Sequence, residues 1–137
     1  MDCLFCSIAE KKVPSVVVYE DESVLAFLDI HPLSLGHAVI IPKRHVENII
    51  KLPQELVGRV FLAVQKVTAM LDSALSPKGF TIGINHGRVS GQTIDHLHIH
   101  VIPRYEGDGG GSIHSVVHNP PAEPLEETRS RILNSNN

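Results

Sequence analysis

The strongest signal in the chain is the segment Ile94-Asp95-His96-Leu97-His98-Ile99-His100-Val101-Ile102-Pro103, in which histidines alternate with aliphatic residues. Successive side chains of a β-strand point to opposite faces of the sheet. The alternation therefore predicts a strand over residues 94–104, with His96, His98 and His100 on one face at spacings of roughly 6.5 to 7 Å. We expect the aliphatic face to pack in the core and the imidazole face to remain free for chemistry.

Further apolar segments predict a sheet around this strand. Apolar residues recur at three- and four-residue steps over residues 53–75, which predicts one long helix that starts at Pro53. The strands are joined by hairpin-length connections without βαβ alternation, so we predict an α+β fold with a five-stranded antiparallel sheet. A variable extension, residues 105–137, follows with a short helix near residues 125–133. The predicted strands are residues 16–20, 23–30, 37–41, 80–85 and 94–104.

Length and charge restrict the function. A chain of 137 residues corresponds to a single domain, which we assign to residues 1–137. The formal charge of −3 and the lack of a basic cluster disfavour nucleic-acid polymers as partners. The apolar runs are too short to span a membrane, and the first residues do not match a secretion signal, so we expect a cytoplasmic protein.

Nine histidines and no tryptophan indicate that histidine carries the chemistry. A row of imidazoles can supply a nucleophilic nitrogen for attack on phosphorus, with neighbours that hold a proton or a positive charge. Two other interpretations stay open: a solvent-facing strand whose polar side happens to be histidine, and a catalytic zinc bound directly by the three histidines. The lack of a nearby carboxylate base argues against the zinc hydrolase.

The segment His96-Leu97-His98-Ile99-His100-Val101-Ile102 resembles the signature of the histidine triad (HIT) superfamily. The resemblance extends over roughly residues 3–104 and implies a HIT-like fold. It also implies that the chain binds a purine nucleotide and cleaves the bond at its α-phosphorus, releasing a nucleoside monophosphate. The implied substrates are nucleoside phosphoramidates, aminoacyl-adenylates or dinucleoside polyphosphates. A nucleotide-binding regulator without turnover is a further alternative.

The resemblance also implies roles for single residues. His98 would be the nucleophile that forms a covalent nucleotidyl-histidine, with its other ring nitrogen fixed by a backbone carbonyl. Asp29 would accept hydrogen bonds from the ribose hydroxyls, and Ile30 would pack on the base. Gln92 and the Gly91 amide would donate hydrogen bonds to developing charge. The catalytic set implied is His98, His100, His96, His37 and Thr93, and the substrate-binding set is Asp29, Ile30, Asn85, Gly91 and Gln92.

Cys3 and Cys6 form a Cys-x-x-Cys pair, which fits a redox pair, two inert thiols or half of a zinc site. The similarity to bacterial-type HIT proteins implies structural zinc bound by Cys3, Cys6, His45 and His96. In that case His96 supports the nucleophile and is not a free proton carrier. The family resemblance further implies a homodimer, paired through helices and edge strands.

Overall fold

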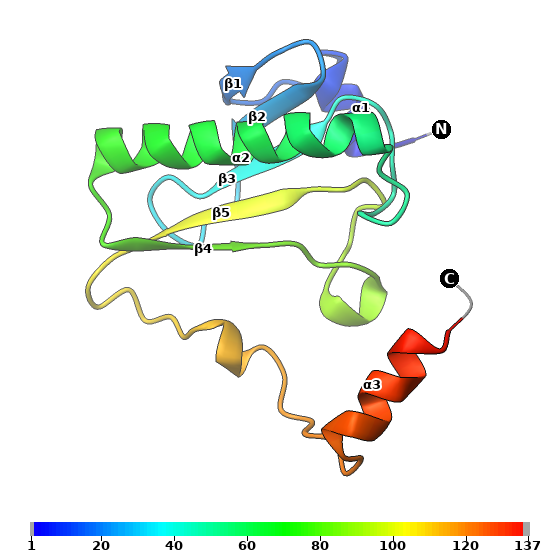
Figure 1. The fold of residues 1–137 in the computed structure, drawn as a ribbon. Helices are drawn as coiled ribbons and strands as arrows, with labels where there is room; N and C mark the ends of the chain where they lie inside the picture. Colours follow the sequence, from blue (N-terminus) through cyan, green and yellow to red (C-terminus); the bar gives the residue numbers. More distant parts are fainter. Residues whose placement is uncertain (1, 136–137) are drawn as a thin grey trace.

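The computed structural model describes residues 2–135 and has the predicted α+β architecture (Figure 1). Five antiparallel strands form one sheet in the order β1-β2-β3-β5-β4. The predicted fold class is confirmed. The strands are β1 (Val17–Glu20), β2 (Val24–Leu28), β3 (Ala38–Pro42), β4 (Gly79–Gly83) and β5 (Ile99–Arg104).

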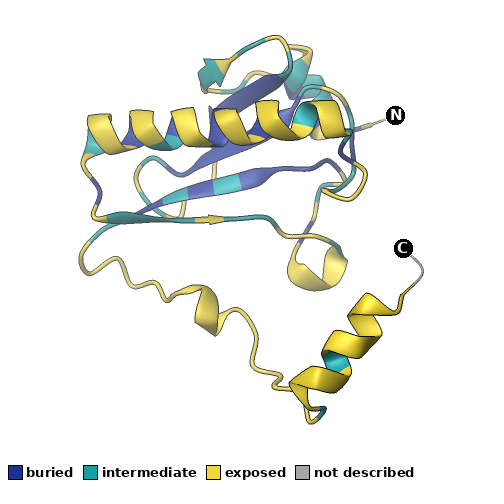
Figure 2. Cartoon of the chain, in the orientation of Figure 1, coloured by how far each residue is buried: buried dark blue, intermediate teal, exposed yellow. Residues whose placement is uncertain are grey.

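The long helix α2 (Gln54–Leu75) covers one face of the sheet (Figure 1). The predicted start at Pro53 is one residue early: the helix begins at Gln54, and Pro53 directly precedes it with φ of −58°. Ser76 ends it in the left-handed conformation, with φ of 49°. The buried stripe of α2 packs against aliphatic side chains of the sheet and forms the main core (Figure 2). That stripe consists of Val60, Ala63, Val64, Val67 and Leu71.

Two separate segments cover the opposite face of the sheet. The short helix α1 (Leu4–Ala9) packs on β2 and β3 through a second cluster that includes Phe5, Phe27 and Ile41. Residues 110–116, which contain the short 3₁₀ turn η2 (Ile113–Ser115), lie over β4 and β5 and enclose a cavity with them. His37 and His100 lie where these two covered regions meet, and His37 is buried while His100 is partly buried.

The predicted strand over residues 94–104 is too long, because β5 begins only at Ile99. The N–H of Leu97 donates to the carbonyl oxygen of Val46 at 2.7 Å, and the N–H of His96 donates to Ile94 at 2.8 Å. These bonds fold residues 94–97 away from the sheet ladder. The expectation of an open imidazole face is also wrong, because α1 packs on it: His96 is fully buried and His98 is 7% exposed.

The chain after β5 runs outward to the helix α3 (Leu125–Leu133), which confirms the predicted helix near residues 125–133. This extension is mostly exposed (Figure 2). Within residues 2–135, no helix is both long and apolar enough to cross a membrane.

Candidate active site

His98 is held in one orientation by its own backbone neighbourhood. Its Nδ1 lies 2.7 Å from the carbonyl oxygen of His96. A carbonyl only accepts hydrogen bonds, so Nδ1 of His98 carries the proton and Nε2 presents a lone pair. The expected backbone carbonyl partner is therefore found. The ring of Phe5 packs edge-on against the His98 ring, with centroids 5.0 Å apart, which restricts the imidazole from the side of α1.

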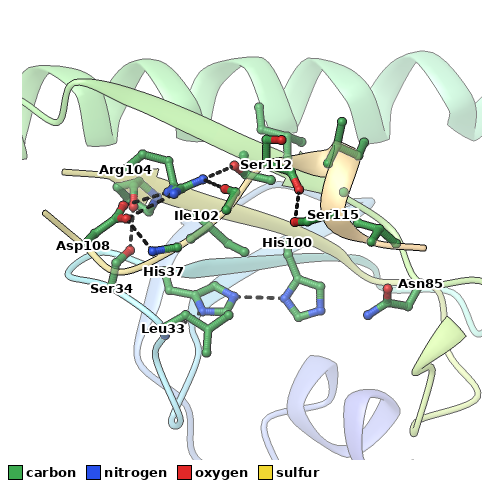
Figure 3. A pocket seen from close by; sticks show the side chains of 18 of the residues that line it. Leu33, Ser34, His37, Asn85, His100, Ile102, Arg104, Asp108, Ser112 and Ser115 are labelled. Atoms are coloured by element: carbon green, nitrogen blue, oxygen red, sulfur yellow. Dashed lines mark hydrogen bonds and ion pairs between the residues drawn. The ribbon is translucent and has the colours of Figure 1, made fainter. Parts of the chain in front are cut away.

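His37 and His100 form a hydrogen-bonded pair whose proton positions follow from one backbone contact. The N–H of Leu33 donates to Nδ1 of His37 at 3.1 Å, so the proton of neutral His37 is on Nε2. That Nε2 lies 2.9 Å from Nδ1 of His100 and donates to it (Figure 3). Neutral His100 therefore carries its proton on Nε2, which makes that atom a hydrogen-bond donor.

Burial keeps both imidazoles of this pair neutral. It lowers the pKa of His37, and the nearby Asp29 carboxylate opposes that shift. Burial, together with the neighbouring His98 and His37, lowers the pKa of His100 to about 4. Near pH 7 the pair is therefore a directional relay of hydrogen bonds without positive charge.

Asp29 follows the end of β2 and lies beside this relay. Its Oδ2 is 3.6 Å from Nε2 of His37, and its Oδ1 accepts the N–H of His31 at 2.9 Å. The next side chain, Ile30, is 81% exposed and has room to contact a ligand. Asp29, His37 and His100 are close enough to share a metal ion. However, His37 already uses the lone pair of Nδ1, and binding a metal through Nε2 would require an imidazolate.

The loop over residues 85–93 supplies two accessible polar side chains. Asn85 and Thr93 are exposed, and Asn85 lines the cavity next to His100 (Figure 3). Gly91 has φ of 104°, and a Cβ there would lie 3.6 Å from the Asn85 amide nitrogen. Glycine therefore allows the positive φ of the turn that lies against the Asn85 amide.

The expected role of Gln92 and of the Gly91 amide as donors to substrate does not agree with the geometry. The side-chain nitrogen of Gln92 donates to the carbonyls of Glu47 and Ile94, and its oxygen accepts the N–H of Gly87. The backbone N–H of Gln92 donates to the carbonyl oxygen of Gly87, and the backbone N–H of Gly91 donates to the carbonyl oxygen of Arg88. Both residues use their donors to shape the loop and have none left for a ligand.

Cys3, Cys6, His45 and His96 come together as a compact cluster beneath α1. Nδ1 of His96 lies 3.4 Å from Sγ of Cys3 and 3.6 Å from Sγ of Cys6, while Nδ1 of His45 lies 3.3 Å from Sγ of Cys6. A tetrahedral zinc with ordinary Zn–S and Zn–N bonds gives sulfur-to-nitrogen edges of roughly 3.5 Å. The donor set and its spacing therefore fit zinc.

The ring of His96 is oriented for that role. Its Nε2 donates to the carbonyl oxygen of Pro42 at 2.8 Å, which leaves the lone pair of Nδ1 toward the two cysteines. His98 instead uses Nδ1 for the His96 carbonyl and presents Nε2. Because His96 presents its lone pair to the thiols, the three triad histidines do not converge on one metal. This geometry disfavours the alternative of a catalytic zinc on the triad.

A cavity of about 500 Å³ extends from His37 and His100 along β4 and β5. Residues 110–116 form its outer wall (Figure 3). The sequence indicated that the segment after Pro103 bears on substrate choice, but it did not place residues 110–116 beside the histidines, and it did not give the contacts of Phe5 and Leu33 with them. The position of Phe5 within the Cys-x-x-Cys segment is the only signal that could have placed that ring near the histidines.

Comparison with known proteins agrees with this geometry. The HIT domain model matches residues 10–107. The chain belongs to the HIT family. A HIT family protein of Bacillus subtilis has the same fold in its crystal structure, with a TM-score of 0.86 and 40% identity over 97% of this chain and 96% of that one. The HIT-like protein of Methanocaldococcus jannaschii is 46% identical over 107 residues, which are 78% of this chain and 82% of that protein.

Two of the relatives have an activity in their names. The adenylylsulfatase HINT3 of Arabidopsis thaliana is 38% identical over 107 residues, which are 78% of this chain and 54% of that protein. The adenosine 5′-monophosphoramidase of Schizosaccharomyces pombe is 39% identical over 104 residues, which are 76% of this chain and 75% of that protein. The match includes a HIT protein that acts on a nucleotide.

Proposed function

We propose that the chain is a nucleotide hydrolase or transferase that cleaves at the α-phosphorus through a covalent intermediate on His98. The observation that carries the proposal is the 2.7 Å contact between Nδ1 of His98 and the His96 carbonyl oxygen. It fixes the tautomer in which Nε2 has a lone pair, and that lone pair is what an attack on phosphorus requires. The phosphoramidase name of one relative supports the same reaction class.

The reaction has two displacements. First, Nε2 of His98 forms a bond to the α-phosphorus, and the bond from phosphorus to the leaving group breaks with its electron pair. The leaving group takes up a proton. Water then attacks the phosphorus and gives up one proton, the bond to Nε2 breaks with its electron pair returning to nitrogen, and a nucleoside monophosphate is released, so that the proton taken up in the first step is returned in the second. Dividing one difficult displacement into two easier ones is the advantage of the covalent route.

The His37–His100 pair stabilises the phosphoryl oxygens in this proposal. Leu33 fixes His37, His37 fixes His100, and the Nε2–H of His100 donates a hydrogen bond to a non-bridging oxygen. Because the donor is held before substrate arrives, no reorganisation is needed as charge develops. Thr93 and Asn85 are exposed and can add contacts to the phosphate or to the leaving group.

Asp29 and Ile30 form the nucleoside side of the proposed site. The Asp29 carboxylate would accept hydrogen bonds from both ribose hydroxyls, and the exposed Ile30 side chain would cover a purine base. Asp29 also lies beside His37, so the ribose and the phosphate relay would be adjacent.

We further propose structural zinc on Cys3, Cys6, His45 and His96, supported by the sulfur-to-nitrogen spacings of the cluster. Burial and the neighbouring Cys3 thiol raise the pKa of Cys6 to about 11. A thiol in this environment holds its proton until a cation replaces it. The bound ion would fasten α1 to the segment that precedes β5.

We also propose a homodimer, because α2 and β4 together expose a surface that suits pairing with a second copy. β4 is an edge strand of the sheet, since β5 is its sole partner among the described residues. Next to this edge, α2 exposes Phe61, which lines a shallow hollow together with Phe80 and Ile82 of β4, and Val57 one turn earlier. An open edge beside an apolar helix face suits pairing with a second copy. Sedimentation at micromolar concentration tests this, and a purely monomeric species contradicts it.

The decisive experiment compares the wild type with His98→Asn on adenosine 5′-monophosphoramidate. We expect the variant to lose turnover by about three orders of magnitude or more, as removal of a nucleophile does in other enzymes. Rapid quench in alkaline detergent, which preserves the acid-labile bond between phosphorus and imidazole nitrogen, should trap a labelled nucleotidyl adduct on the wild type only. His118→Ala, which changes an exposed histidine of the extension, is the control and should retain activity.

Two results would overturn this proposal. Equal turnover by wild type and His98→Asn removes His98 as the nucleophile. Tight nucleotide binding by the wild type without any adduct or product would instead identify a regulator that binds nucleotide without turnover.

A further inference from the structure

The side chains that line the cavity next to the His37–His100 pair indicate which substrates it can accept. It begins at His37 and His100 and continues between the sheet and residues 110–116. Most of its wall is hydrocarbon, from both strands and from η2 (Figure 3). A volume of about 500 Å³ is enough for a group the size of an amino-acid side chain or an aromatic amine. The apolar lining residues include Leu33, Ile82, Ile84, Ile102, Ile113 and Val116.

Arg104, which also lines this cavity, is not free to bind an anion. Its Nε and Nη2 donate to the two carboxylate oxygens of Asp108, at 2.7 and 3.1 Å. Its Nη1 donates to Thr81 Oγ1 at 3.0 Å and to the Gly111 carbonyl oxygen at 2.6 Å. These bonds use four of the five N–H groups of the guanidinium, and Asp108 neutralises its charge.

The histidines at the entrance add no charge to the cavity. His37 and His100 are hydrogen-bonded to each other, and burial lowers the pKa of both, so they are neutral near pH 7. Among the described residues that line the cavity, Arg104 is the one lysine or arginine. A polyphosphate placed here would lose water without gaining a counter-charge, which costs free energy.

The position of the cavity matches the path of a leaving group. In an in-line displacement the leaving group departs from the side of phosphorus opposite the nucleophile. His98 is packed against Phe5 on the α1 side, whereas the cavity starts at His37 and His100 and runs away from α1. A phosphorus atom between His98 and His100 would therefore direct its leaving group into the cavity.

We infer that this cavity is the leaving-group subsite and that it selects an uncharged, apolar leaving group, such as the amine of a phosphoramidate, over a polyphosphate. This inference rests on the proposed function and narrows its substrate class. Ile113 and Val116 of the extension, together with the Arg104–Asp108 pair, are then specificity-determining residues. None of them touches the reacting atoms.

The test measures kcat/KM for two substrates, the phenethylamine phosphoramidate of adenosine monophosphate and diadenosine tetraphosphate. The variant Ile113→Lys places a cation in the wall at an exposed position, and Val116→Lys repeats the change three residues later. Val117→Lys is the matched control, because Val117 is similarly exposed but does not line the cavity. Comparing variants cancels the different chemical reactivities of the two substrates.

We expect the wild type to prefer the phosphoramidate by about tenfold or more, since roughly two buried methylene groups supply that factor. Ile113→Lys and Val116→Lys should each shift the preference toward the tetraphosphate by about fivefold, the effect of one favourable charge contact. Val117→Lys should retain the wild-type ratio.

Three outcomes overturn the inference. A wild-type preference for the tetraphosphate contradicts the apolar subsite directly. Equal effects of Ile113→Lys and Val117→Lys show that the cavity does not hold the leaving group. In both cases cleavage itself continues, so the proposed function stands. If the wild type cleaves neither substrate, the proposed function fails and the inference falls with it.

Discussion

His98 Nδ1 lies 2.7 Å from the backbone carbonyl oxygen of His96, whose own ring faces Cys3 and Cys6. One residue therefore belongs to both clusters, through its backbone in the first and its side chain in the second. Any movement of the His96 ring is transmitted over a single residue to the carbonyl that orients His98. This connection couples the proposed zinc site to the proposed nucleophile.

The first prediction concerns that coupling. Cys6→Ser should reduce bound zinc from about one ion per chain to nearly none, because a serine hydroxyl is a poor zinc ligand. Activity should fall by about tenfold to a hundredfold, the usual cost of disturbing groups that support a metal-linked residue. Metal analysis by mass spectrometry, thermal unfolding and kcat measure the three effects.

Ser7→Ala, in the same turn of α1, is the control and should keep both zinc and activity. Circular dichroism at the assay temperature shows whether Cys6→Ser remains folded. Full zinc content in a folded Cys6→Ser variant would remove Cys6 from the ligand set. Loss of zinc with unchanged kcat would disprove the coupling through His96.

The second prediction concerns Phe5, which packs against the rings of His98, His96 and Phe27. Phe5→Ala should lower the free energy of unfolding by about 3 to 5 kcal/mol, as expected for a buried aromatic residue replaced by a methyl group. Phe5→Leu keeps most of the volume and should cost about 1 kcal/mol. Urea titration measures both values.

Phe5→Leu separates packing from orientation. It removes the edge-on contact with the His98 ring while the core stays filled, so kcat should fall more than the small loss of stability explains. Leu4→Ala, at an exposed neighbouring position, is the matched control. A Phe5→Leu variant with wild-type kcat would limit Phe5 to a packing role.

Local patterns predicted which segments of the chain form strands, but they did not predict where β5 starts. Alternation over residues 94–104 is continuous, yet the ladder begins at Ile99 because Val46 captures the N–H of Leu97. Val46 is far away in sequence, so no local pattern reports this bond. The burial of His96 and His98 under α1 has the same cause, a tertiary contact that alternation does not encode.

The residues of the site were predictable by type but not always by contact. The Cys-x-x-Cys pair and the histidines named the zinc candidates, and the four donors do lie together. Gln92 was expected to face substrate because an amide can donate, but the backbone carbonyls of Glu47 and Ile94 accept from its side-chain nitrogen. The hydrogen-bond partners of a side chain depend on its surroundings in the folded chain and do not follow from its chemical type.

The third prediction concerns stability at low pH. The pKa of His100 is lowered to about 4 in the folded chain, against 6.5 for the ordinary side chain. Between these values the unfolded chain binds a proton at this residue and the folded chain does not, so the free energy of unfolding falls as the pH falls from 6.5 to about 4. The slope from one such group is at most about 1.4 kcal/mol per pH unit.

His100→Gln should flatten this dependence, because glutamine does not titrate while its amide keeps a polar group near His37. Urea titrations at several pH values between 7 and 4 measure the free energy of unfolding of wild type and variant. His37 also has a lowered pKa and remains in both proteins, so the difference between the two curves reports the titration of His100 together with its contact to His37. Parallel curves would show that His100 takes up its proton in the folded chain as readily as in the unfolded one.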